Sequence, residues 1–395
     1  MATAITLVLA SGSAELFAQQ NNPPNVPPGL KRIDGTFHTL FYDITDDEAV
    51  DALARMEAMV REYSARTSAF SGKIRGRLPF LLFRRDTDYI DAGGMEGSAG
   101  MFDGQRLMAV AGRKITNSTW HTIQHEGFHQ FARTVIGGQL PPWVNEGMAE
   151  YFGEGVYCGD GFVTGAVPNF RLKRIQQAIE EKQFRPMDQF MLLSQEQWNG
   201  QLTEQNYDQA WSIVQFLAHG DNGKYQQAFT NFMIELGRGG LWQPAWDKCF
   251  GRGDGFEQAW RTWWLKQKEN PTLDVYATAA VRMLGNYSAR ATSQKQTFES
   301  VEAFHAAIRR GSIKTHPADA LPPSLAGDCA DLVASLTKVG IHFAFDYPKK
   351  GPTQFPSAVI ATLPDGRTIT GTVTARGPRA GPVTVTTKSP TKKSE

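Results

Sequence analysis

The segment TIQHEGFHQF, residues 122–131, carries two histidines four positions apart, with a glutamate directly after the first. Residues 117–120 supply N-cap side chains for a helix, on which His125 and His129 lie one turn apart on one face. Both imidazoles can then reach one ion, while Glu126 projects beside them and can hold a water without being a ligand. The alternative is a pair of structural histidines on the surface or in the core.

A second helix with a further metal-ligand candidate follows the histidines. A double glycine at 137–138 ends the first helix, and Pro141–Pro142 permits a new start that continues with helical spacing through Phe152. If the helices fold back antiparallel, arms of about 12 Å bring Glu146 level with His129. Two histidines and a glutamate would give the three protein ligands of a catalytic zinc, which keeps a fourth position open.

Three nearby residues allow more than one interpretation. Glu150 lies one turn beyond Glu146, where it can accept a hydrogen bond from the outer ring nitrogen of a ligating histidine, or it is an exposed carboxylate. His121 precedes His125 by one turn but has no adjacent base, so we expect it to pack or to support a ligand. Cys158 is expected in a loop or as a buried thiol.

HEGFH, followed sixteen residues later by NEGMAEYF, resembles the gluzincin metallopeptidases, in which a downstream glutamate completes the helix motif. The wider stretch is similar to an uncharacterised bacterial family in that group, described as a domain of unknown function with a peptidase-like site. The resemblance covers about residues 39–266, and its specific motifs lie between Trp120 and Glu154. It implies one zinc per chain, with His125, His129 and Glu146 as ligands and Glu126 as general base.

The resemblance also suggests a role for Tyr207. In related gluzincin aminopeptidases, a tyrosine in a Tyr-x-Lys-Gly-Ala helix start stabilises the oxyanion. NYDQAWSIVQFL places Tyr207 similarly, but with Gln and Ala where that pattern has Lys and Gly. A core aromatic is the alternative, because apolar residues share its helix face: Trp211, Val214 and Leu217. The sequence has no Gly-Ala-Met-Glu-Asn substrate loop, which argues against binding of a free peptide amino terminus.

Charge and cysteine content exclude several classes of protein. The 41 basic residues nearly balance the 40 acidic ones, so no basic field exists to attract nucleic acid. Three cysteines are too scattered for a disulfide framework or a CxxC metal site, although one bridge stays open: Cys158, Cys249 and Cys329.

The expected fold class is α+β, with an N-terminal mixed β-sheet carrying the active-site helix, a helical lobe and a small C-terminal β-containing region. The expected divisions are a candidate signal peptide at 1–20, a proline-rich linker at 21–30, an α/β subdomain at 31–117, the zinc helix and helical lobe at 118–270, a helical or irregular connecting region at 271–350, a hairpin region at 351–387 and a tail at 388–395. The first segment lacks a basic residue before its apolar run and contains Glu15, so export to the periplasm, cell surface or medium stays open. We expect no membrane-spanning segment beyond that leader.

These observations predict a zinc-dependent metallopeptidase acting on a peptide or protein substrate. Glu126 would take a proton from the attacking water and pass it to the leaving amine. The strand around Arg106–Val110, expected at a sheet edge, could pair with an extended substrate backbone. The alternatives are a catalytically silent protein that keeps the fold to bind a partner, against which the retained Glu126 argues, and a cell-surface module that binds through the C-terminal hairpin.

Overall fold

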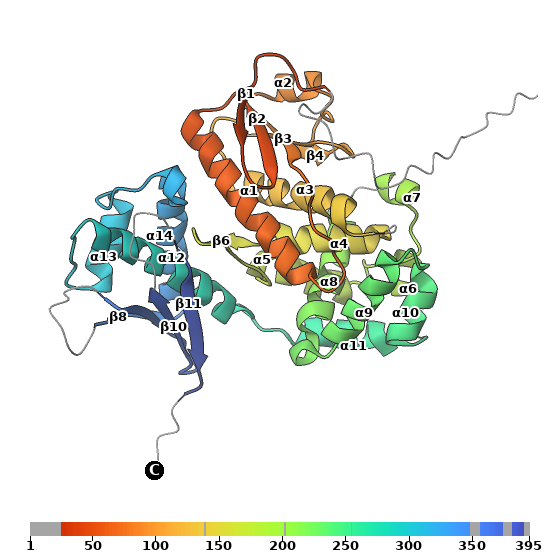
Figure 1. Cartoon of the computed structure of the whole chain (residues 1–395). Helices are drawn as coiled ribbons and strands as arrows, with labels where there is room; N and C mark the ends of the chain where they lie inside the picture. The colour runs from red at the N-terminus through yellow and green to blue at the C-terminus, as the bar shows by residue number, and fades with distance from the viewer. Residues whose placement is uncertain are drawn as a thin grey trace, which may run out of the picture.

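The computed structural model describes residues 25–137, 140–200, 203–253, 255–347, 356–373 and 381–390. It has an N-terminal sheet, a helical middle and a separate C-terminal sheet with its own helices (Figure 1). The predicted α+β class is therefore confirmed. The expected leader, the start of the linker, Gly138 and the end of the tail lie outside the described residues.

The N-terminal sheet has five strands in the order β1-β2-β3-β5-β4. They are β1 (Lys31–Asp34), β2 (His38–Tyr42), β3 (Leu78–Phe83), β4 (Gly100–Phe102) and β5 (Leu107–Val110). The three central strands are parallel, and β1 and β4 pair antiparallel at the edges. Apart from His38 and Thr39 at the start of β2, the side chains of the central strands are apolar on both sides, as is typical of strands covered on two faces.

Helices cover both faces of this sheet. Phe80 and Leu82 of β3 join the main core beneath α1 (Asp46–Thr67), whereas Leu81 and Phe83 pack with α2 (Asp86–Asp91). The α1 helix begins at a capping box between Thr45 and Glu48.

The prediction that the strand from Arg106 lies at the edge of the sheet is wrong. The segment from Arg106 pairs as β5 with β3 on one side and with β4 on the other, so β4 is the edge strand. β4 comes from the glycine-rich segment at 91–105, in which glycines obscure strand periodicity. Gly100 permits its close packing, since a Cβ there would lie 2.9 Å from both the Met108 carbonyl oxygen and Thr122 Cγ2.

The middle of the chain is mostly helical, and its centre is a layer in which α4 packs between α3 and α8. Gly147 of α4 allows this approach, because a Cβ there would lie 2.5 Å from the carbonyl oxygen of Ala210 on α8. The elements are α3 (Asn117–Val135), α4 (Pro142–Gly153), β6 (Val156–Tyr157), β7 (Phe162–Val163), α5 (Asn169–Glu180), α6 (Met187–Phe190), α7 (Gln195–Asn199), α8 (Glu204–Gly223), α9 (Gln226–Gly237), α10 (Trp242–Phe250) and α11 (Gly255–Lys266).

The C-terminal part is a four-stranded antiparallel sheet, ordered β11-β10-β9-β8, with α12 packed against it. Its elements are α12 (Leu273–Ser293), α13 (Val301–Arg309), the 3-10 helix η1 (Pro317–Asp319), α14 (Pro323–Lys338), β8 (His342–Asp346), β9 (Ala358–Thr362), β10 (Thr368–Val373) and β11 (Val383–Lys388). β9 and β10 form the predicted hairpin. The region 271–350, expected to be helical or irregular, contributes α12, α13 and α14 to this part, and also the strand β8, which was not predicted.

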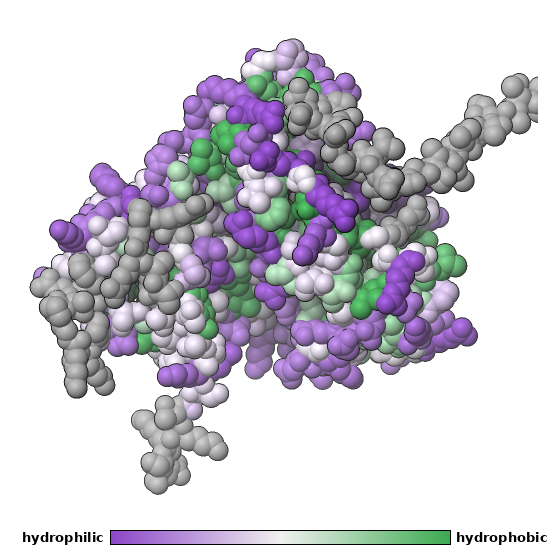
Figure 2. Space-filling view, viewed as in Figure 1, coloured by the Kyte–Doolittle hydropathy of each residue, from purple (hydrophilic) through white to green (hydrophobic). Residues whose placement is uncertain are grey.

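The surface shown in Figure 2 carries mixed hydropathy, and the three cysteines are not paired. Figure 2 shows hydrophilic residues spread over much of one face, with smaller hydrophobic areas between them. No helix within the described ranges combines the length and apolarity needed to cross a bilayer. Cys158, Cys249 and Cys329 are free thiols, and Cys158 is buried, as one of its two interpretations expected.

Candidate metal centre

The α3 helix presents the two histidines toward α4. It starts one residue earlier than predicted, since Thr116 is the N-cap and accepts a hydrogen bond from the backbone N–H of Thr119. Phe128 and Phe131 anchor the opposite face in the main core. The histidines are therefore held on a helix that is packed on one side and turned to the second predicted helix on the other.

The imidazole nitrogens of His125 and His129 meet the carboxylate of Glu146. His125 Nε2 lies 3.1 Å from His129 Nε2 and 3.2 Å from Glu146 Oε2. His129 Nε2 lies 3.4 Å from the same oxygen. Ligand atoms around a tetrahedral zinc with bonds of 2.0–2.1 Å are about 3.3 Å apart. The three side chains thus fit one ion of this size without rearrangement.

The electrostatics of this cluster favour positive charge. Burial by itself lowers the pKa of both histidines, but Glu146 and other carboxylates outweigh it and raise the pKa of His125 well above its ordinary value and that of His129 above its own. Burial also opposes ionisation of Glu146, yet the two imidazoles lower its pKa to about 2. A cation is therefore stabilised at the point where the three side chains meet.

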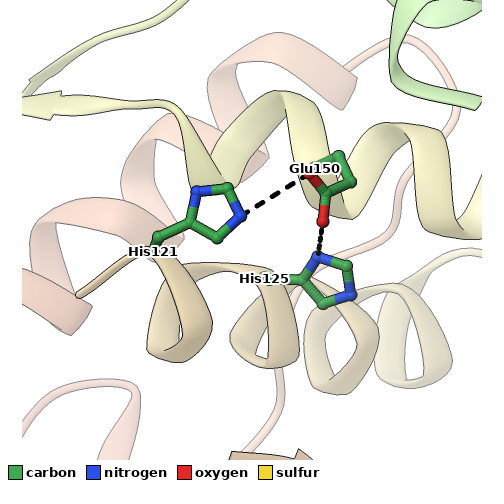
Figure 3. Close-up of side chains that lie close together, drawn as sticks. All are labelled: His121, His125 and Glu150. Atoms are coloured by element: carbon green, nitrogen blue, oxygen red, sulfur yellow. Dashed lines mark ion pairs between the residues drawn. The ribbon is translucent and has the colours of Figure 1, made fainter. Parts of the chain in front are cut away.

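Glu150 supports the outer side of His125 (Figure 3). Its Oε1 lies 3.1 Å from His125 Nδ1, and its Oε2 lies 3.6 Å from His121 Nε2. Glu150 is buried, so the exposed-carboxylate alternative is wrong. His121 stands beside this carboxylate, as expected of a residue that supports a ligand.

His121, His125 and Glu150 form a second group whose ligand atoms are close enough for a metal. However, a guanidinium already lies against this group, because Arg171 Nη2 donates to Glu150 Oε2 over 2.5 Å. A permanent cation at this oxygen disfavours a second divalent ion. The set that includes His129 and Glu146 is therefore the better metal candidate.

The side chain of Glu126, on α3, reaches β4 at the edge of the N-terminal sheet. The backbone N–H of Phe102, on β4, donates to Glu126 Oε2 over 2.8 Å. The true edge strand, β4, is thus the strand that contacts the candidate base.

Tyr207, on the first turn of α8, contacts both the candidate centre and the core. Its ring centroid is 6.0 Å from that of His125 and 5.6 Å from that of the buried Trp198, both edge-to-face. Burial, followed by the charge of Glu146, raises the pKa of Tyr207 well above its ordinary value. Its hydroxyl therefore keeps its proton at neutral pH and can act as a donor.

Arg171, which was not predicted from the sequence, joins the candidate centre to its surroundings. This buried residue contacts Glu150 of α4, Glu154 directly after α4 and Asp208 of α8. No local pattern separates it from the neighbouring basic residues of α5, so only the tertiary structure identifies it.

A family model described as "Protein of unknown function (DUF1570)" matches residues 119–235. This span runs from the start of α3 into α9 and contains the three candidate ligands, Glu126, Glu150, Arg171 and Tyr207. The chain has no significant match among curated proteins. The comparisons therefore identify a domain of unknown function over the candidate centre and assign no activity to it.

Proposed function

We propose that the protein is a zinc-dependent metallopeptidase. The observation that carries the proposal is the convergence of His125, His129 and Glu146 at separations of 3.1–3.4 Å, the spacing a tetrahedral zinc requires. When bound, zinc would polarise a scissile carbonyl and lower the pKa of its water toward neutrality.

Glu126 is the residue we assign to proton transfer. The hydrogen bond from Phe102 fixes its Oε2, and Oε1 is the oxygen that would take the proton of the attacking water and pass it to the leaving amine. Besides accepting this hydrogen bond, a carboxylate directly beside the candidate ligands is suited to proton transfer, a role that a protein that only binds a metal would not need.

Tyr207 and β4 are the groups we assign to the substrate. The protonated hydroxyl of Tyr207 would donate to the oxyanion that develops on the scissile carbonyl. β4 replaces Arg106–Val110 as the strand that would pair with an extended peptide backbone, because no strand among the described residues pairs with its outer edge and it ends beside Glu126.

Metal analysis combined with a peptide-library cleavage profile tests this proposal. The purified protein is expected to bind about one zinc per chain and to cleave peptides. Glu126→Gln should keep its zinc and lose activity about a hundredfold or more. Glu299→Gln, at an exposed position in the C-terminal part, is the matched control and should be unaltered. Zinc binding without cleavage by the wild type would favour the catalytically silent alternative.

A further inference from the structure

Arg171 is a buried cation that contacts three carboxylates, one on α4, one directly after α4 and one on α8. It is 3 % exposed. Its Nη2 lies 2.5 Å from Glu150 Oε2, its Nη1 2.7 Å from Glu154 Oε1 and its Nε 2.9 Å from Asp208 Oδ1. The guanidinium carbon lies 4.3 Å from the ring centroid of Trp211, which adds a cation–π contact. All three nitrogen positions of the guanidinium are therefore in use.

The contact with Glu150 determines which oxygen faces the metal-ligand candidate. Arg171 holds Oε2, while Oε1 lies against His125 Nδ1. An acceptor on the outer nitrogen of a ligating histidine fixes its tautomer and ring orientation. Arg171 thus acts on His125 through Glu150.

His121 is the competitor for the same carboxylate. Its Nε2 lies 3.6 Å from Glu150 Oε2 (Figure 3). Its Nδ1 lies 3.9 Å from Glu154 Oε1. These separations are longer than the corresponding ones to Arg171, so the guanidinium is the dominant partner of both carboxylates. Without it, Glu150 would be drawn toward His121 and away from His125.

Through Asp208, Arg171 also contacts α8, the helix that carries the candidate oxyanion donor Tyr207. Asp208 directly follows Tyr207 on α8, and α8 packs closely against α4, which carries Glu146 and Glu150. Arg174 Nη2 also lies 2.9 Å from Asp208 Oδ1, but the described contacts of Arg174 do not include Glu150 or Glu154. Arg171 is therefore the link between the two helices at this level.

We propose that Arg171 is a positioning residue of the metal centre, which holds Glu150 against His125 and keeps α4 in register with the turn that carries Tyr207. This inference rests on the proposed function, because it takes both His125 and Tyr207 in their assigned roles. It adds a function for a residue that touches neither the metal ligands nor the substrate directly.

Zinc affinity, measured by competition with a chelator, and the visible spectrum of the Co²⁺-substituted protein test the inference without relying on activity. Arg171→Met removes the charge, and Arg171→Lys keeps it but cannot reproduce a planar fork across three carboxylates. Both should bind zinc about 10–100-fold more weakly, the range for loss of an outer partner, and should alter the Co²⁺ spectrum. Arg174→Met is the matched control and should retain the affinity and spectrum of the wild type.

A double-variant comparison separates positioning from a general effect on folding. If Arg171 acts through Glu150, Arg171→Met combined with Glu150→Gln should lose no more zinc affinity than the more affected single variant. Losses that multiply would overturn the inference. Arg171→Met can fail to fold because it leaves buried carboxylates without a neutralising cation. In that case the measurement is made on Arg171→Lys.

The wild-type measurement distinguishes the two proposals. A wild type that binds no zinc overturns the proposed function and this inference with it. A wild type that binds zinc, beside Arg171 variants of equal affinity and unaltered Co²⁺ spectrum, overturns this inference alone.

Discussion

The backbone N–H of Phe102 donates to Glu126 Oε2 over 2.8 Å, which joins the free edge of the N-terminal sheet to the candidate base. An N–H bonded to α3 in this way is directed away from the ladder that β4 forms with β5. The position of the carboxylate therefore depends on the backbone of the same strand that we expect to pair with a substrate.

Phe102→Pro tests this dependence because proline lacks the N–H. Proline is tolerated at an edge strand where the N–H is outside the ladder, so we expect the fold and the zinc to be retained. The value of kcat should fall about tenfold or more, since one charge-assisted hydrogen bond to the base is lost. Phe102→Ala keeps the N–H and controls for loss of the ring. Equal kcat in the two variants would show that the hydrogen bond does not position Glu126.

Glu146→Ala tests the third ligand. Removing a ligand should weaken zinc binding by more than the roughly 10–100-fold expected for an outer partner such as Glu150. Chelator competition on Glu146→Ala and Glu150→Gln, with circular dichroism to check folding, gives the comparison. Affinity equal to that of the wild type in Glu146→Ala would remove this residue from the centre.

Local signals account for the parts of the fold that were predicted well. The capping box and the apolar spacing of α1, residues 46–67, lie within or directly before the segment itself, so such a helix can be recognised from its sequence. α4 could be predicted for the same reason, from prolines at its start and helical spacing after them. The placement of Glu146 beside His129 followed from two helix lengths and one turn.

The interactions that were missed depend on contacts between distant segments. Arg171 meets Glu150 and Asp208, which lie 21 and 37 positions away in the sequence. The Phe102 hydrogen bond also joins separate elements, and β4 itself is three residues long and follows glycines. A strand this short has too little periodicity to be recognised from its sequence and forms only by pairing with β5. Because β4 was not predicted, β5 was wrongly placed at the edge of the sheet.

His219 gives a pH-dependent prediction away from the candidate centre. Burial, followed by the charge of Arg66, lowers the pKa of His219 to about 4 from an ordinary 6.5. Below pH 6.5 the unfolded chain therefore takes up a proton that the folded protein does not. Stability present above that pH falls as the pH drops toward 4, with a slope of up to about 1.4 kcal/mol per pH unit.

Urea unfolding between pH 7 and pH 4.5 checks this slope. Carboxylates also titrate at the acidic end, but they contribute equally to His219→Gln, so the difference between the two proteins isolates the histidine. The free energy of unfolding of the wild type should fall more steeply with acid than that of His219→Gln. If the free energy of unfolding of both proteins changes equally with pH, the buried neutral imidazole of His219 does not contribute to the pH dependence of stability.

Tyr207 is the least constrained catalytic assignment, because its ring contacts both His125 and the buried Trp198. If the hydroxyl donates to the developing oxyanion, the interaction strengthens only in the transition state, so Tyr207→Phe should lower kcat with little change in KM, zinc content or melting temperature. Loss of one such donor typically costs about 3–4 kcal/mol, or roughly two to three orders of magnitude in kcat.

The opposite pattern is expected if the ring only packs. Tyr207→Phe would then be nearly silent, while Tyr207→Ala would lower the melting temperature by leaving a cavity beside Trp198. Tyr225→Phe, a half-buried tyrosine of the helical lobe, is the matched control for loss of a hydroxyl. Measuring kcat, KM and thermal stability for the three variants decides between the roles. A fully active Tyr207→Phe beside an unstable Tyr207→Ala would assign Tyr207 to the core, and the oxyanion would then require another donor.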